Sequence, residues 1–149
     1  MERDRIPPTE LFLAFGPALL ALAGGIAAWS VPLAWQPIAI AFGWLWSSAI
    51  LLFLAGVTRG LSFFSPGGAR WSQLFEMAWL FLLGLFAFAT PLAWALPLLM
   101  IGYASVAAFD LYAAPRGMAP ARFAWLRPPQ ILIFLAGLAG LWLRVRAMG

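Results

Sequence analysis

The chain has 149 residues, of which 64% are hydrophobic and only 9% are charged, and its formal net charge is +4. Soluble domains carry about 25% charged and about 45–50% apolar residues, so the composition excludes a soluble globular domain and predicts a protein embedded in lipid. The chain has no Cys and no His, which removes disulfides, thiolate nucleophiles, imidazole bases and the usual zinc ligands. We therefore expect no cofactor, no metal and no catalytic residues.

All nine basic residues are Arg, and they lie between apolar runs rather than in a basic stripe with interleaved aromatic residues. This pattern argues against nucleic-acid binding. Arg residues at the ends of apolar runs set the orientation of a membrane protein and contact anionic lipid headgroups. The expected partners are therefore membrane lipids and other membrane protein subunits.

A helix needs about 20 consecutive apolar residues to cross a bilayer. Five apolar runs of about this length follow one another, at residues 10–29, 37–57, 74–89, 92–111 and 128–143. The sequence thus predicts an all-α, polytopic membrane helix bundle, with residues 1–149 forming a single integral membrane domain.

The polar lead over residues 1–9 is a poor signal peptide, because its acidic and basic residues cancel and the apolar run behind it is too long. Pro17 is expected to kink the first span. Small residues including Gly24 and Gly25 predict a smooth face for close helix packing, and the step from Gly56 to Gly60 predicts a second one.

The fifth span is predicted to begin at Pro128-Pro129 and to end near Leu143, so it and the third span, with 16 residues each, are the shortest. Its length is at the low end for crossing a bilayer, so a partial or tilted crossing is an open alternative.

The Arg residues predict the orientation, since cytoplasmic loops of membrane proteins are enriched in basic residues. If the N-terminus is cytoplasmic, the outer side holds Arg144 and Arg146 only. The inner side then holds Arg3, Arg5, Arg59, Arg70, Arg116, Arg122 and Arg127. We therefore expect an N-in, C-out protein of a bacterial inner (cytoplasmic) membrane, or of the mitochondrial inner membrane in a eukaryote.

Four charged residues are candidates for a polar cluster at the inner face: Arg59, Glu76, Asp110 and Arg127. A carboxylate at mid-depth in a membrane helix costs about 2.5–3.5 kcal/mol, and a cationic partner offsets much of that cost. We expect Asp110 to pair with Arg127 or with Arg59 and so to join the helices. The alternative is a functional site for an anionic headgroup or a proton.

Three stretches, together with the order of the predicted spans, point to a known family. They are FLAGVTRG from Phe53 to Gly60, Asp110 at the end of the fourth span, and Trp125-Leu126-Arg127 at the fifth span. Together they resemble an uncharacterised family of small membrane proteins, domain of unknown function 3429, which includes mitochondrial transmembrane protein 69. In that family the first stretch resembles FLGG, an aliphatic residue, a basic residue and Trp-Gly. Here the basic residue comes one place later and the Trp is missing, and Pro-Pro-Gln replaces the usual residues after Arg127. The resemblance implies about five spans and brings no known activity.

Three hypotheses for function follow. The favoured one is a non-catalytic accessory, structural or assembly component of a larger membrane complex. The alternative is a small oligomeric transporter, channel or lipid-handling protein, although no charge lies at mid-depth in a span. A third is an intramembrane enzyme that uses Glu76 or Asp110 as acid or base.

Overall fold

The computed structural model describes residues 7–149, so the charged lead at positions 2–5 and the predicted inner-side Arg3 and Arg5 lie outside the described range. The described chain is all-α, and five of its helices are long and apolar enough to cross a membrane. They are α1 (Pro8–Ser30), α2 (Gln36–Ser62), α3 (Trp71–Ala89), α4 (Leu92–Ala113) and α5 (Phe123–Met148). Two short 3₁₀ turns, η1 (Leu33–Trp35) and η2 (Ala114–Arg116), lie at helix ends.

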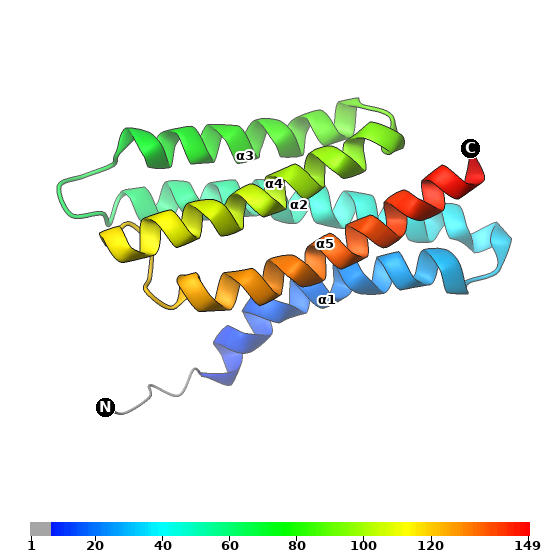
Figure 1. Cartoon of the computed structure of the whole chain (residues 1–149), viewed down its shortest axis with the longest axis horizontal. Coiled ribbons are helices and arrows are strands. Elements are labelled where there is room, and N and C mark those ends of the chain that lie inside the picture. The colour runs from blue at the N-terminus through cyan, green and yellow to red at the C-terminus, as the bar shows by residue number, and fades with distance from the viewer. Residues whose placement is uncertain (1–6) are drawn as a thin grey trace.

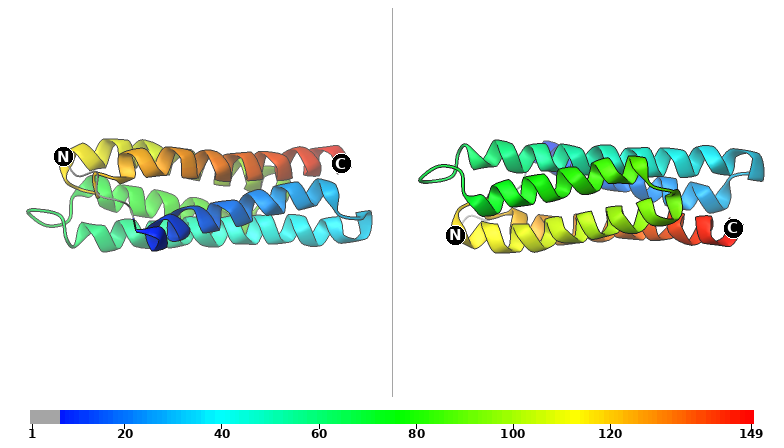
Figure 2. Two further views of the ribbon diagram at one scale, coloured as in Figure 1. Left: turned by 90° about the horizontal axis from the view of Figure 1, so that it is seen from below. Right: turned by 90° about the horizontal axis from the view of Figure 1, so that it is seen from above.

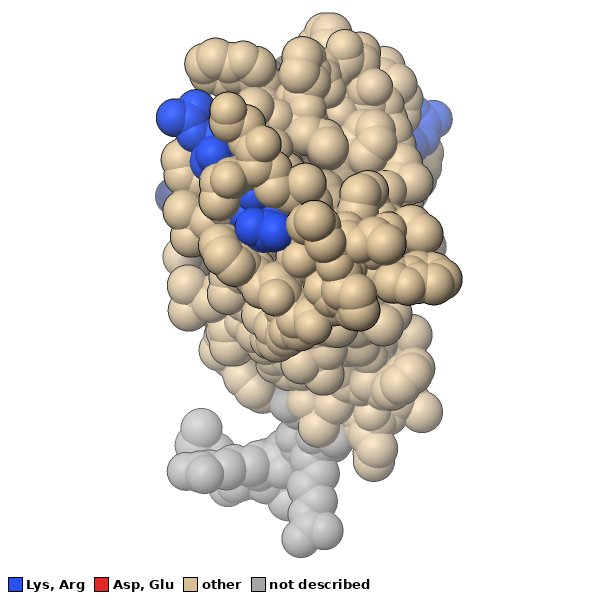
Figure 3. All heavy atoms as spheres, turned by 90° about the vertical axis from the view of Figure 1, so that its right-hand side faces the viewer, with Lys and Arg blue, Asp and Glu red and all other residues tan. Residues whose placement is uncertain are grey.

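The helices lie side by side in an elongated bundle with all loops at its two ends (Figures 1 and 2). Each helix packs against its neighbour in the chain, and α5 closes the bundle by packing against both α4 and α1. Because the number of long helices is odd, the described N-terminal segment and the C-terminus lie at opposite ends (Figure 1). At the end with the C-terminus, a few basic groups stand out from a surface that is otherwise formed by uncharged residues (Figure 3).

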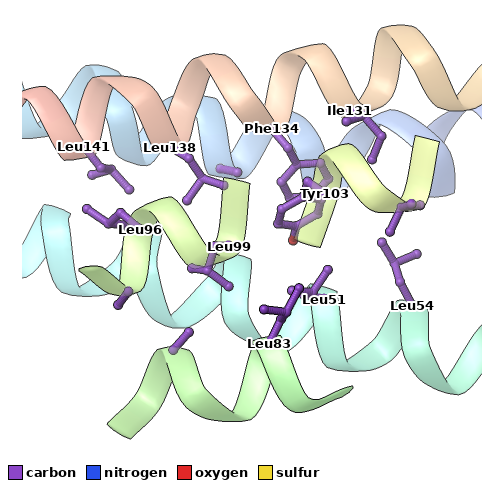
Figure 4. Packing of buried hydrophobic residues seen from close by; sticks show 14 of the residues in the cluster. Leu51, Leu54, Leu83, Leu96, Leu99, Tyr103, Ile131, Phe134, Leu138 and Leu141 are labelled. Carbon is purple, nitrogen blue, oxygen red and sulfur yellow. The ribbon is translucent and has the colours of Figure 1, made fainter. Parts of the chain in front are cut away.

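The centre of the bundle is built around Tyr103 of α4 and Phe134 of α5, both fully buried. Their rings stack with centroids 4.2 Å apart, and the Tyr103 hydroxyl donates a 2.7 Å hydrogen bond to the carbonyl oxygen of Ser47. Leucines from α2, α3, α4 and α5 fill the space around this pair (Figure 4). The hydrogen bond lets a phenol lie in an apolar core without an unpaired hydroxyl.

Glycines permit the closest helix contacts, and those on α1 lie at two of them. A Cβ atom added to Gly24 would lie 3.0 Å from Gly43 Cα on α2. A Cβ atom added to Gly25 would lie 2.5 Å from the carbonyl oxygen of Gly137 on α5. Close to this contact, Trp29 Nε1 donates a hydrogen bond to the Gly140 carbonyl at 2.9 Å. The smooth face predicted on the first span therefore lies against both α2 and α5.

The second predicted step behaves differently, because a Cβ atom added to Gly56 or Gly60 meets no heavy atom within 4 Å. The two glycines lie one turn apart on the same side of α2, whereas the adjacent Leu54 and Ala55 take the buried side. The expectation that this step packs helices together does not hold within the described chain, since its face points outward.

The last helix extends beyond the predicted span at both ends. Helix α5 begins at Phe123, five residues before Pro128, and continues to Met148, so it has 26 residues. At a rise of 1.5 Å per residue, such a helix is about 39 Å long and exceeds a hydrocarbon core of about 30 Å. Pro128 and Pro129 lie inside the helix rather than at its start. Membrane helices tolerate internal prolines where neighbouring groups satisfy the freed backbone. The second span is also longer than predicted and ends at Ser62.

Pro17 lies inside α1, as the sequence indicated, and the first turns of this helix diverge from the rest of the bundle (Figure 1). Proline has no N–H to donate to the carbonyl four residues before it, and its ring crowds that carbonyl, so the helix bends there. The Pro17 carbonyl accepts a 2.9 Å hydrogen bond from Trp46 Nε1 on α2. This bond fixes α1 to α2 at the point of the bend.

Candidate functional site: a buried polar cluster at one end of the bundle

Asp110 and Arg127 form a buried ion pair between the last turns of α4 and the beginning of α5. Arg127 Nε lies 3.0 Å from Asp110 Oδ2, and the two side chains are only 11% and 9% exposed. Arg127 Nη1 also donates to Gln130 Oε1 at 3.2 Å, and its guanidinium lies 4.5 Å from the centroid of the Phe123 ring. The guanidinium is thus held by an anion, an amide and an aromatic face, which fixes its direction.

Glu76, in the second turn of α3, is the second carboxylate of the cluster. It is 7% exposed and accepts a 3.2 Å hydrogen bond from Thr58 Oγ1 on α2. Glu76, Thr58 and Asp110 line one small cavity with about 10 Å³ of space for the centre of a water molecule. That is about the room that one water needs. The cluster therefore sets two carboxylates against one guanidinium and joins α2, α3, α4 and α5.

Gln73 connects the two loops next to this cluster. Its Nε2 donates to Ser65 Oγ at 2.7 Å and to the Met118 carbonyl at 3.2 Å, and its Oε1 accepts from the Arg70 backbone N–H at 3.1 Å. These bonds close the loop between α2 and α3 against the loop between α4 and α5. These loop partners follow no periodic pattern, so the sequence does not signal them.

Arg59, the other predicted partner of Asp110, lies apart from the cluster. Its side chain is exposed, and its guanidinium lies 5.8 Å from the centroid of the Phe63 ring. No ion pair to Arg59 is formed within residues 7–149. Arg59 does not reach Asp110 because it lies on the outward side of α2, together with Gly56 and Gly60. Of the two predicted partners of Asp110, Arg127 forms the ion pair and Arg59 does not.

Two further polar contacts were not predicted. Glu10 at the beginning of α1 pairs with Arg122 just before α5, with Oε2 and Nη1 2.7 Å apart. At the opposite end, Arg144 donates to Gln36 Oε1 and lies over the Trp29 ring, 5.2 Å from its centroid. Both contacts span more than one hundred residues of sequence, so no local pattern signals them.

The cluster can hold the ends of four helices together. Among residues 7–149, no group of three or more His, Cys, Asp or Glu side chains could hold a metal ion. No family model matches the chain, and no curated protein or solved structure matches it. The resemblance to domain of unknown function 3429 therefore stays a prediction that is based on the sequence stretches named above.

Proposed function

We propose that the chain is a non-catalytic accessory, structural or assembly component of a larger complex in the membrane, which it joins through helix contacts. The observation that carries this proposal is the filled interior of the bundle. Tyr103, Phe134 and the leucines around them close the centre, and the charged side chains lie towards the two ends. Within the described chain a single copy therefore offers no polar path through which a solute or ion could cross.

The outer surface of the bundle supports the same proposal. Every long helix turns large apolar side chains outward, and examples, one from each helix in order, are Phe12, Phe53, Phe81, Ile101 and Leu132. The open Gly56–Gly60 step lies on this surface, where the backbone of another helix can approach closely. The connections between helices are short, so contacts with a partner would be made chiefly within the membrane.

Purification in a mild detergent tests the proposal. We expect the chain to co-elute with the same set of membrane subunits at a fixed stoichiometry, measured by mass spectrometry of the peak fraction. A homogeneous monomer or small homo-oligomer would contradict the accessory role. That result would favour the second candidate, a small oligomeric transporter, channel or lipid-handling protein. One observation supports this second candidate: a groove of about 390 Å³ is open between α1, α2 and α5.

The proposal includes an N-in, C-out orientation in a bacterial inner membrane, or in the mitochondrial inner membrane of a eukaryote. It is supported by the described Arg residues, which divide unequally between the two ends of the bundle. Arg144 and Arg146 lie at the end with the C-terminus. The other end carries Arg59, Arg70, Arg116, Arg122 and Arg127.

A chain without Cys allows a direct measurement of orientation, because one introduced Cys is the only thiol. Ala69→Cys lies in the exposed loop between α2 and α3. Ser30→Cys is also exposed and lies at the last residue of α1, at the other end of the bundle. In intact spheroplasts we expect a membrane-impermeant maleimide to label Ser30→Cys at once. Ala69→Cys should react only after the membrane is opened. The reverse labelling pattern would place the N-terminus outside.

A further inference from the structure

A groove beside the Pro17 bend has an apolar floor and one charged end. Because the first turns of α1 diverge from the bundle, a space of about 390 Å³ is left between α1, α2 and α5. Ligand sites in proteins usually measure about 300–1,000 Å³. Away from this charged end the lining is mainly apolar and includes Leu13, Ala14, Ile50, Phe53, Leu54 and Leu126.

The charged end of the groove is formed by Glu10, Arg122 and Arg127. The charge of Arg127 is balanced by Asp110, which lies outside the groove. Arg122 is 48% exposed and contacts Glu10 through Nη1. Its other guanidinium N–H groups have no acceptor within residues 7–149. Arg is suited to binding phosphate because its planar fork offers several parallel donors.

We propose that this groove binds one acyl chain of an anionic phospholipid, with the lipid phosphate on Arg122. The occupant follows from the lining: the apolar walls match hydrocarbon, and the guanidinium N–H groups of Arg122 that Glu10 leaves unused can donate to the oxygens of a lipid phosphate. The mouth lies at the Arg-rich end of the bundle, at the depth where the headgroups of a bilayer leaflet would lie. This proposal does not depend on the accessory role, since a tightly bound lipid is compatible with a subunit of a complex and with a separate protein.

Native mass spectrometry of the delipidated protein in mild detergent tests the site. The probes are dioleoyl phosphatidylglycerol, which is anionic, and dioleoyl phosphatidylcholine, which is zwitterionic, added at equal concentrations. We expect the wild-type chain to bind phosphatidylglycerol about tenfold more tightly, because the trimethylammonium group of phosphatidylcholine offsets the charge of the phosphate that Arg122 would contact. Equal binding of the two lipids would overturn the proposal.

Two variants that both break the Glu10–Arg122 pair separate lipid binding from a structural role. Arg122→Gln removes the phosphate donors and is expected to lower phosphatidylglycerol binding about tenfold, to the level of phosphatidylcholine. Glu10→Gln frees Arg122 and removes a repelling carboxylate, so phosphatidylglycerol binding should rise or stay as in the wild type. Equal losses in both variants would show that the pair matters only for structure and would overturn the proposal.

The apolar part of the groove is tested by filling it. Ala14→Phe places a ring in the groove and is expected to reduce the binding of both lipids by at least tenfold. Leu132→Phe is the control, because it adds bulk on an exposed face of α5 outside the groove and should bind as the wild type does. Wild-type phosphatidylglycerol binding by a folded Ala14→Phe variant would contradict the proposal. If Ala14→Phe fails to fold, the comparison of Arg122→Gln, which should lose phosphatidylglycerol binding, with Glu10→Gln, which should not, still decides.

Discussion

Arg127→Met is expected to destabilise the bundle by about 3–5 kcal/mol, because it leaves the Asp110 carboxylate buried without its counter-ion. Asp110→Asn should have a loss of the same order, since it removes the carboxylate that the buried Arg127 guanidinium contacts directly. The free energy of unfolding in mixed micelles measures both effects. In cells, the steady-state level of each variant should fall with it.

The double variant Asp110→Leu with Arg127→Met is the decisive comparison. Replacing a buried ion pair by apolar residues of similar size is often close to neutral, so we expect it to recover most of the lost stability. Exposed Arg59→Met is the matched control and should stay within about 0.5 kcal/mol of the wild type. If Asp110→Asn accumulates normally but the cells lose the wild-type phenotype, the pair is a functional site rather than a structural link.

Gly137→Ala should destabilise the chain by about 1–3 kcal/mol, and Gly137→Leu by more, because overpacking forces backbone shifts. A Cβ atom at this position would lie 2.6 Å from the carbonyl oxygen of Ala21 and 2.9 Å from Leu22 Cα. Both are backbone atoms of α1, so no side-chain rotation can relieve the clash. The thermal midpoint of the detergent-solubilised protein is the measurement.

Gly56→Ala is the control for this prediction, since a Cβ atom there meets nothing within 4 Å. It should stabilise α2 by up to about 1 kcal/mol through helix propensity alone. Equal effects of Gly56→Ala and Gly137→Ala would mean that the α1–α5 contact is looser than the structure has it. If Gly56→Ala instead weakens co-elution with partner subunits, its outward face is part of the proposed contact surface.

The number and order of the five long apolar helices could be predicted because each run of about 20 apolar residues is a local signal. The beginning of α5 could not, because Pro128-Pro129 usually marks a helix start, whereas here the helix continues through both prolines. The ion pair was predicted only as two alternatives. The sequence shows that Arg59 and Arg127 are both basic and both lie near helix ends. It does not show which way Arg59 points, because that depends on which side of α2 packs inward.

The remaining part of the site depends on the angles at which helices pack. Glu10 and Arg122 meet because Pro17 bends α1 and α5 begins before its prolines, and neither the degree of bending nor the early start is visible in the sequence. Gly24 and Gly25 were recognisable as a small-residue face. Their partners, Gly43 and Gly137, lie on two different helices and are set by the closure of the bundle.

The contact between the first and last helices can form only late in the synthesis of the chain. The hydrogen bond from Trp29 to Gly140 joins residues 111 positions apart. A ribosome adds about 5–20 residues per second, so α1 waits roughly 6–22 s after its own synthesis before that partner exists. During this interval the glycine face of α1 that later meets α5 lies against lipid or against an insertion factor. Truncated chains that end before α5 would keep this face of α1 without its partner.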